Sequence, residues 1–136
     1  MKKVISVLLV CVLVLCSMSF AMAEEIMPRF NVITAVTCGI FPANNAIEYD
    51  VHLLIPSQNT LDSAYIDLEL RNTAGTVVAT RLGRRMSLDG LSFKYMDSSP
   101  VTTNGTYFYT YEIRCYKDGV LVDNPTGTSR TLVYTL

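Results

Sequence analysis

The sequence predicts an all-β protein, an antiparallel β-sandwich of about seven short strands. Three observations lead to this fold class. Apolar side chains recur at every second position in most segments, which is typical of strands with one buried face. Stretches rich in Gly, Asn, Asp and Pro separate these segments and favour turns. No segment has the apolar period of an amphipathic helix.

The first 23 residues are expected to be a cleaved signal peptide. Two lysines precede an unbroken apolar run that ends at Cys16, and small residues follow up to Ala23. A basic start, an apolar stretch and an Ala-Met-Ala site are the features of a secretory leader. A membrane anchor is the alternative, but the run is shorter than the roughly 20 residues that cross a bilayer. We therefore predict a secreted protein whose domain spans residues 24–136.

Length and charge limit the classes of function. Removing residues 1–23 leaves 113 of the 136 residues, the size of one domain. Two lysines leave with the leader, so 9 basic residues face 12 acidic ones, a charge of −3 with histidine neutral. This balance gives no general attraction to nucleic acid or to an anionic membrane. No second hydrophobic segment follows, so we expect a soluble mature chain without a membrane span.

The first four predicted strands lie between residues 30 and 82. Residues 30–41 are apolar on both faces, as expected of a covered strand. Residues 46–55 and 65–71 alternate between apolar and polar side chains, so each is expected to have one buried and one solvent-facing side. The sequence Asn-Thr-Ala-Gly then favours a turn that leads into a returning strand at 76–82.

The later strands include the most aromatic one. Residues 91–96 alternate again, and residues 107–116 carry three tyrosines, an isoleucine and Cys115 at the odd positions. Because this side has no charge, it is expected to face the core, and the tyrosines to form a core wall rather than a binding surface. Their hydroxyls are expected to reach backbone carbonyls or water. A Lys-Asp-Gly turn follows, and residues 130–136 form the last strand.

These segments resemble an immunoglobulin-like sandwich. The resemblance is carried by NGTYFYTYEIRCYKDG, by residues 30–41 followed by AIEYDVHLLI, and by the hairpin IDLELRNTAGTVVAT. The chain is similar to small exported proteins of Gram-positive gut bacteria that consist of a leader and one such domain. This resemblance covers nearly all of residues 29–136 and implies a fold without a particular activity. The chain has no tryptophan, and Ile113 stands where antibody domains carry a corner tyrosine, so Tyr107 is the candidate for that role.

Cys38 and Cys115 are the two cysteines outside the leader, and we predict that they form a disulfide. The bridge would join the first predicted strand to the sixth and close a loop of 77 residues (115 − 38). On the chain-entropy model such a loop stabilises the fold by about 4–5 kcal/mol. The alternatives are a free reactive thiol or a metal pair, but two cysteines and one distant histidine make a poor metal site.

No catalytic or cofactor-binding constellation is apparent. His52, the only histidine, lies on the polar side of its strand, away from either cysteine. The carboxylate pairs Glu48 with Asp50 and Asp67 with Glu69 are interpreted as solubilising charge, because a glycosidase pair needs a cleft between its carboxylates. Neither a phosphate-binding loop nor zinc-ligand spacing is present. We therefore predict no enzymatic activity, no cofactor and no metal site.

The leading functional hypothesis is a secreted, non-enzymatic binding or adhesion module whose ligand is an extracellular protein or glycan. The expected contacts are outward-facing aromatic residues and an arginine cluster, because guanidinium groups dock acidic surfaces: Phe108, Tyr116, Arg81, Arg84 and Arg85. Binding loops are expected at 56–62, 83–90 and 97–105. The alternatives are a structural subunit that pairs through edge strands and a small secreted hydrolase.

Overall fold

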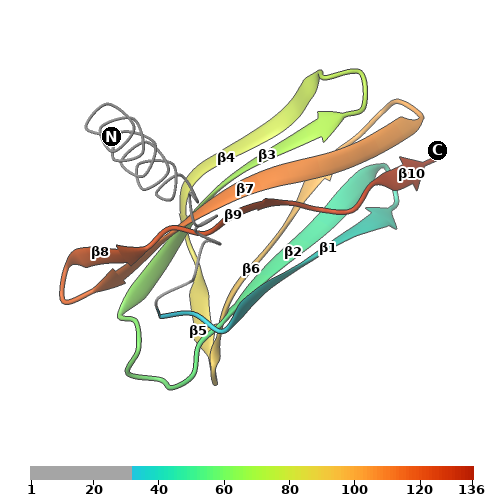
Figure 1. The fold of residues 1–136 in the computed structure, drawn as a ribbon. Coiled ribbons are helices and arrows are strands. Elements are labelled where there is room, and N and C mark those ends of the chain that lie inside the picture. Colours follow the sequence, from blue (N-terminus) through green and yellow to red (C-terminus); the bar gives the residue numbers. More distant parts are fainter. Residues whose placement is uncertain (1–31) are drawn as a thin grey trace, which may run out of the picture.

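Alternating apolar and polar residues produce ten antiparallel strands in residues 32–136, the part of the chain that the computed structural model describes (Figure 1). The strands are β1 (Ala35–Ala43), β2 (Ala46–Leu54), β3 (Ser63–Asn72), β4 (Val77–Arg85), β5 (Ser87–Asp89), β6 (Ser92–Pro100), β7 (Gly105–Lys117), β8 (Val120–Asp123), β9 (Thr126–Thr128) and β10 (Leu132–Tyr134). The all-β prediction is confirmed, whereas the predicted number of about seven strands is too low.

The strands form two sheets that stack face to face (Figure 1). Sheet A has the order β1-β2-β6-β5, and sheet B has the order β10-β7-β3-β4, with β8 and β9 also paired to β7. In an immunoglobulin-like sandwich the first, second, fifth and fourth strands form one sheet and the third, sixth and seventh the other, with an added strand beside the third in variable-type domains. This chain has that arrangement, which confirms the predicted immunoglobulin-like architecture.

The core lies between the two sheets and is built from every second residue of the central strands. In β2, β3 and β7 the buried positions alternate with partly exposed ones, as the sequence period predicts. The side chains that are almost completely buried include Ile47, Tyr49, Val51, Leu53, Ile66, Leu68, Leu70, Tyr109 and Ile113. The tyrosines of β7 therefore form a wall of the core, and that prediction is confirmed.

The hydroxyls of the two fully buried tyrosines of β7 bond to backbone carbonyls, also as predicted. Tyr109 reaches across the sandwich and donates to the carbonyl of Asp50 at 2.7 Å, with the carbonyl of Gly39 3.1 Å away. Tyr107 donates to the carbonyl of Thr103, four residues upstream, at 2.7 Å. This bond is the equivalent of a tyrosine corner, so Tyr107 takes the role that the sequence assigned to it.

The extra strands arise because the C-terminal part of the chain pairs with β7 in three pieces. β10 pairs with the beginning of β7, β9 with its middle and β8 with its end. Pro125 separates β8 from β9 because it has no N–H for a sheet hydrogen bond, although its carbonyl still accepts from Ile113 at 2.8 Å. Between β9 and β10, the Ser129 hydroxyl replaces a backbone acceptor for the Tyr109 N–H at 2.9 Å.

The predicted disulfide between Cys38 and Cys115 is not formed, and both thiols are free. Cys38 lies beside Tyr109: burial raises the pKa of the Tyr109 hydroxyl, and the Cys38 thiol adds to the rise. Cys115 is six residues further along β7, or about 20 Å at about 3.3 Å per residue. A disulfide requires Cα atoms within about 7 Å of each other, so the two cysteines are too far apart.

The predicted signal peptide, residues 1–23, lies outside the described residues, as does the expected start of the domain at residue 24. Export therefore stays a prediction. Within residues 32–136, no helix has the length and apolar character needed to cross a membrane.

Candidate binding site

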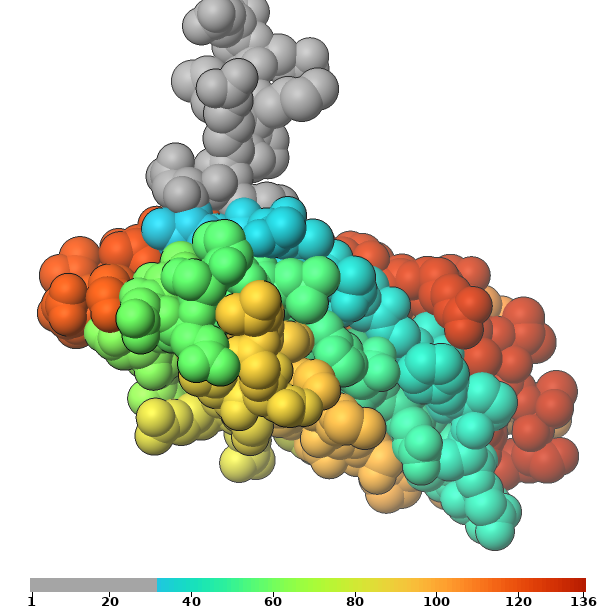
Figure 2. Space-filling model, turned by 90° about the horizontal axis from the view of Figure 1, so that it is seen from below, coloured from blue at the N-terminus to red at the C-terminus, as the bar shows by residue number. Residues whose placement is uncertain are grey.

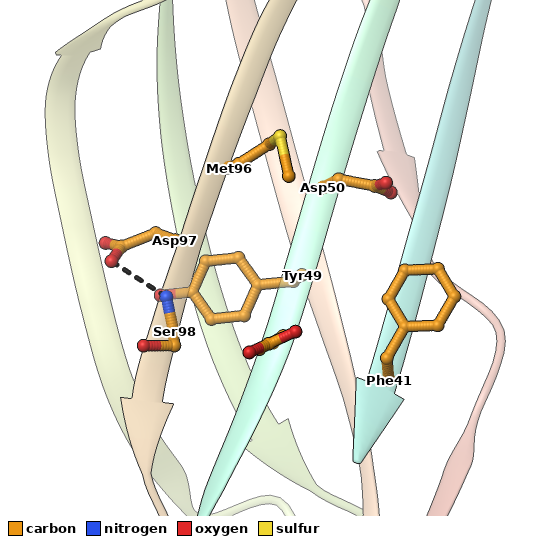
Figure 3. A pocket seen from close by; sticks show the side chains of 7 residues that line it. Phe41, Tyr49, Asp50, Met96, Asp97 and Ser98 are labelled. Atoms are coloured by element: carbon orange, nitrogen blue, oxygen red, sulfur yellow. Dashed lines mark hydrogen bonds between the residues drawn. The ribbon is translucent and has the colours of Figure 1, made fainter. Parts of the chain in front are cut away.

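β1, β2 and β6 lie side by side in sheet A (Figure 2), and the outer face that they form carries a hollow. Two cross-strand rows meet there: Phe41 pairs with Glu48 and Glu48 with Ser98, while Gly39 pairs with Asp50 and Asp50 with Met96. The hollow has a volume of about 430 Å³ and is lined by Phe41, Glu48, Tyr49, Asp50, Met96, Asp97 and Ser98 (Figure 3). We call it the sheet A hollow.

Gly39 leaves a gap in the face of sheet A that its neighbours occupy. A Cβ atom at this position would lie 2.6 Å from the Phe41 ring and even closer to the Asp50 carboxylate. Both side chains therefore fold over the bare glycine backbone, which is possible only because residue 39 has no side chain. The absence of a side chain at Gly39 thus sets where Phe41 and Asp50 stand in the hollow.

Two large apolar side chains stand exposed in the sheet A hollow. Phe41 is 43% exposed and Met96 is 71% exposed, and they approach from opposite sides of β2 (Figure 3). The Arg130 guanidinium lies 6.0 Å from the centre of the Phe41 ring, at the outer limit of a cation–π contact. An exposed apolar group rimmed by polar residues is characteristic of an interaction surface.

The sheet A hollow contains two carboxylates, those of Glu48 and Asp50, that no described Lys or Arg side chain neutralises. Glu48 is exposed and forms no ion pair with any described residue. Asp50 lies 3.5 Å from Nε2 of His52, which is charged only when protonated. At neutral pH, therefore, Glu48 and Asp50 present about two negative charges beside the Phe41 ring.

Asp97 lies beside the sheet A hollow, but its cross-strand partner is the buried Tyr49, so its carboxylate is on the inner side of β6, where three donors hold it. Its carboxylate accepts from Arg81 Nε at 2.7 Å, from the Tyr95 hydroxyl at 2.9 Å and from the Ser98 amide at 2.8 Å. Burial by itself raises the pKa of Asp97, but these hydrogen bonds outweigh it and hold the pKa below its usual range. Arg81 also donates to the carbonyl of Ser98 at 3.2 Å, so it links β4 of sheet B to β6 of sheet A.

The three arginines of the predicted cluster do not form one surface. A bulge at Gly83, which has a φ of +59°, pairs Ile66 with Arg84 and Leu68 with Arg81. Because Ile66 and Leu68 are core residues, both arginines lie on the inner side of β4, where Arg81 is engaged by Asp97. Arg85 pairs instead with Tyr65 on the outer face of sheet B. A regular strand would have put residues 81 and 85 on the same side.

Phe108 and Tyr116 do point outward from β7, as predicted, but they do not converge. They lie on sheet B, on the side of the molecule opposite the sheet A hollow. Eight residues separate them, or about 26 Å along the strand. Tyr116 packs edge-on against Tyr65 with 5.9 Å between the ring centres, while Phe108 pairs with Arg71. The structure therefore does not bring Phe108, Tyr116 and the arginines together in one patch.

The outer face of sheet B also has a hollow, of about 260 Å³, and each of its carboxylates is bonded to a neighbouring side chain. Arg114 binds Asp67 at 3.0 Å, Arg71 binds Glu69, and Asn124 donates to Glu112 at 3.0 Å. Like the predicted surface charges, these groups solubilise the sheet. Of the three carboxylates in this hollow, two are therefore in ion pairs, and the third, Glu112, is bonded by a neutral amide.

The binding loops expected from the sequence are only partly loops. The segment 83–90 belongs mostly to β4 and β5, and 97–100 belongs to β6, so of the expected loop segments only 101–104 and 56–62 connect strands.

His52 stands on the outer face of sheet A, whereas Cys38 and Cys115 lie on the core side, as the sequence period predicts. Within the described part of the chain, no group of three or more His, Cys, Asp or Glu residues is placed to hold a metal ion.

The sequence did contain a signal for Phe41. Residues 30–41 read as apolar on both faces and were interpreted as a covered strand. In the structure β1 is the outer strand of its sheet, and its second apolar face presents Phe41 to solvent. An apolar outer face on a sheet that no segment of residues 32–136 covers is a binding-site signal, but the sequence pattern was interpreted as packing instead.

No family model matches the chain, and no curated protein matches it. Among solved structures, it is similar to a CARDB domain from Pyrococcus furiosus, solved in complex with di-metal ions, with 16% identity and a TM-score of 0.45 over 78% of this chain and 91% of the other. It is also similar to a putative beta-galactosidase from Bacteroides fragilis, with 14% identity and a TM-score of 0.39 over 68% of this chain and 15% of the other. Both likenesses are too distant to transfer a function.

Proposed function

We propose that the protein is a secreted, non-enzymatic binding module that takes an extracellular protein or glycan on the outer face of sheet A. The observation that carries this proposal is the sheet A hollow, where Phe41 and Met96 stand exposed beside Glu48 and Asp50. Aromatic side chains and methionine are enriched in the centres of interfaces, and methionine adapts its shape to a partner. A few polar groups around them give a bound molecule its orientation.

The scaffold beneath the hollow is suited to binding. All of its lining residues come from β1, β2 and β6, which are paired along nine residue positions on each side of β2. Sites built on strands hold their side chains more accurately than sites on loops. On the inner side of the sheet, the bond from Arg81 to Asp97 ties β6 to β4.

The proposal that the module is secreted is supported by the leader pattern in residues 1–23 and by its resemblance to exported single-domain proteins. Mass spectrometry of the protein recovered from the culture medium of an expressing cell tests it. We expect a chain that begins at Glu24. A chain that stays in the cell with its first 23 residues attached would contradict export.

Binding on sheet A is tested with the purified chain and immobilised panels of extracellular proteins and glycans. We expect Phe41→Ala to weaken any binding at least tenfold, the usual effect of removing an aromatic anchor from an interface. Phe108→Ala removes the same ring from the opposite face and is the matched control, so its binding is expected to match that of the unaltered chain. Unchanged binding by Phe41→Ala together with loss in Phe108→Ala would move the site to sheet B.

Assembly through edge strands is the second candidate function, and it has one observation in its favour. β4 is the outer strand of sheet B and exposes Val77, Val78 and Leu82. However, the bulge at Gly83 and the arginines around it are features that prevent such an edge from pairing with another strand. Measuring the size of the purified chain in solution over a wide concentration range tests this assembly function. A chain that is monomeric at every concentration would exclude it.

A further inference from the structure

We propose that the group bound in the sheet A hollow is the cationic side chain of a lysine or arginine in a basic segment of a partner protein. This inference rests on the proposed function, because it names the ligand for the same site. Three features of the hollow carry it: its unpaired charge, its aromatic ring, and the apolar surface between them.

The charge around the hollow favours a cation. Two carboxylates face the hollow, Glu48 and Asp50, and neither has a permanently charged partner among the described residues. Of the nearby cations in that part of the chain, Lys94 pairs with Asp89, and Arg130 forms no ion pair with either carboxylate. His52 adds positive charge only when it is protonated. An incoming ammonium or guanidinium group would neutralise the two free carboxylates, which a neutral sugar cannot do.

The ring and the methionine complete the site for such a side chain. Phe41 presents a π surface next to Glu48, its cross-strand neighbour, and a cation over such a face is attracted to it. The Arg130 guanidinium lies 6.0 Å from the ring centre, at the outer limit of such a contact. Met96, which is 71% exposed, offers apolar contact to the methylene groups of a lysine or arginine stem.

The open shape of the hollow indicates a partner protein rather than a free amine. A small amine would touch only one side of a hollow of about 430 Å³ on a sheet face, whereas a polypeptide segment places further contacts around it. The expected charge of −3 on residues 24–136 also attracts a basic partner over longer distances.

The test is an NMR titration of the isotope-labelled chain with three probes: penta-lysine, penta-glutamine and chitotetraose. We expect penta-lysine alone to shift the backbone signals of residues 39–41, 48–50 and 96–98. Its affinity should fall as salt is added, because the attraction is between exposed charges. Glu48→Gln should weaken penta-lysine binding about threefold, the size of one exposed ion pair, and Glu48→Gln with Asp50→Asn about tenfold.

The matched control is Glu112→Gln, which removes one charge from the outer face of sheet B. We expect it to bind penta-lysine as the unaltered chain does, and weakening equal to that of Glu48→Gln would overturn the inference by showing a general charge effect. Shifts at the hollow with chitotetraose and none with penta-lysine would also overturn it, while leaving binding on sheet A intact. Absence of shifts at the hollow with every probe would overturn it as well, and unchanged binding by Phe41→Ala would then remove the proposed function too.

Discussion

At the scale of single residues, Gly39 determines the shape of the proposed site. Its backbone is extended rather than left-handed, so the position needs glycine for space and not for conformation. Phe41 and Asp50 occupy the volume that a Cβ would take. This coupling places an aromatic ring and a carboxylate side by side, although they come from different strands.

Gly39→Ala is expected to destabilise the fold by about 1–2 kcal/mol, because the added methyl group forces Phe41 and Asp50 apart. It should also weaken binding at the sheet A hollow. Urea denaturation measures the first effect. Gly105→Ala is the control: its added Cβ would lie 3.4 Å from the Tyr107 ring, an ordinary contact, so a loss as large as that of Gly39→Ala would contradict the steric explanation.

At the level of the strands, the alternation of apolar and polar residues predicted which faces are buried, but it did not predict where a strand is interrupted by a bulge. The buried faces of β2, β3 and β7 follow from sequence period alone, and so does the outward position of His52. The bulge at Gly83 does not, because one extra residue in a strand reverses the side on which every later residue points. The arginine cluster therefore looked like one surface in the sequence and is divided between two in the structure.

The ion pair between Arg81 of β4 and Asp97 of β6 predicts that the stability of the fold depends on pH. The folded-state pKa of Asp97 lies below its usual value of about 3.9, so the unfolded chain takes up this proton at a higher pH than the folded one. Its ionised form therefore stabilises the fold above about pH 4, and that contribution is lost as the pH falls through the folded-state pKa.

Asp97→Asn removes this contribution and is expected to cost about 1 kcal/mol at pH 7, the value of a partly exposed pair. The stability difference from the unaltered chain should shrink progressively below pH 4. Denaturation curves at several pH values measure it. Asp89→Asn, whose ion pair with Lys94 is on the surface, is the comparison and should change stability less; a difference for Asp97→Asn that stays constant down to pH 2 would contradict the role of the ion pair.

At the scale of the whole molecule, the two sheets are held by packing and hydrogen bonds rather than by a covalent bridge. The sequence predicted the bridge from cysteine number and export, but neither fixes the distance between two residues on different strands. Tyr109, which bonds from β7 to carbonyls of β1 and β2, and Arg81, which joins β4 to β6, are two of the cross-links between the sheets. Tyr134, whose hydroxyl donates from β10 to the carbonyl of Ala43 in β1, is a third.

The two thiols are expected to differ in reactivity. Cys115 is completely buried, and this burial, followed by the charge of Asp123, raises its pKa to about 12. Cys38 is only half-buried. Alkylation of the native protein at pH 8 without reductant, followed by mass spectrometry, should modify Cys38 first, and unfolding should make both available. A mass two hydrogens lower and no alkylation after unfolding would show a disulfide and contradict the structure.

The sheet A hollow could be predicted only in part from the sequence, because it depends on how distant strands pair. Glu48 and Asp50 were visible as polar residues of a half-exposed strand, but their proximity to Phe41 and Met96 depends on the registers of β1 with β2 and of β2 with β6. Strand register and sheet order are properties of the whole fold. The alternation of apolar and polar residues shows which side of a strand faces solvent. It does not show which strands are neighbours in the same sheet.

Binding through sheet A can be tested by mapping where a ligand touches the molecule. Amide hydrogen exchange of the chain, measured with and without a ligand identified in the binding panels, gives that map. We expect slowed exchange in β1, β2 and β6 around the sheet A hollow and unchanged exchange in β3 and β4. Protection confined to sheet B, or to the loops at 56–62 and 101–104, would contradict it.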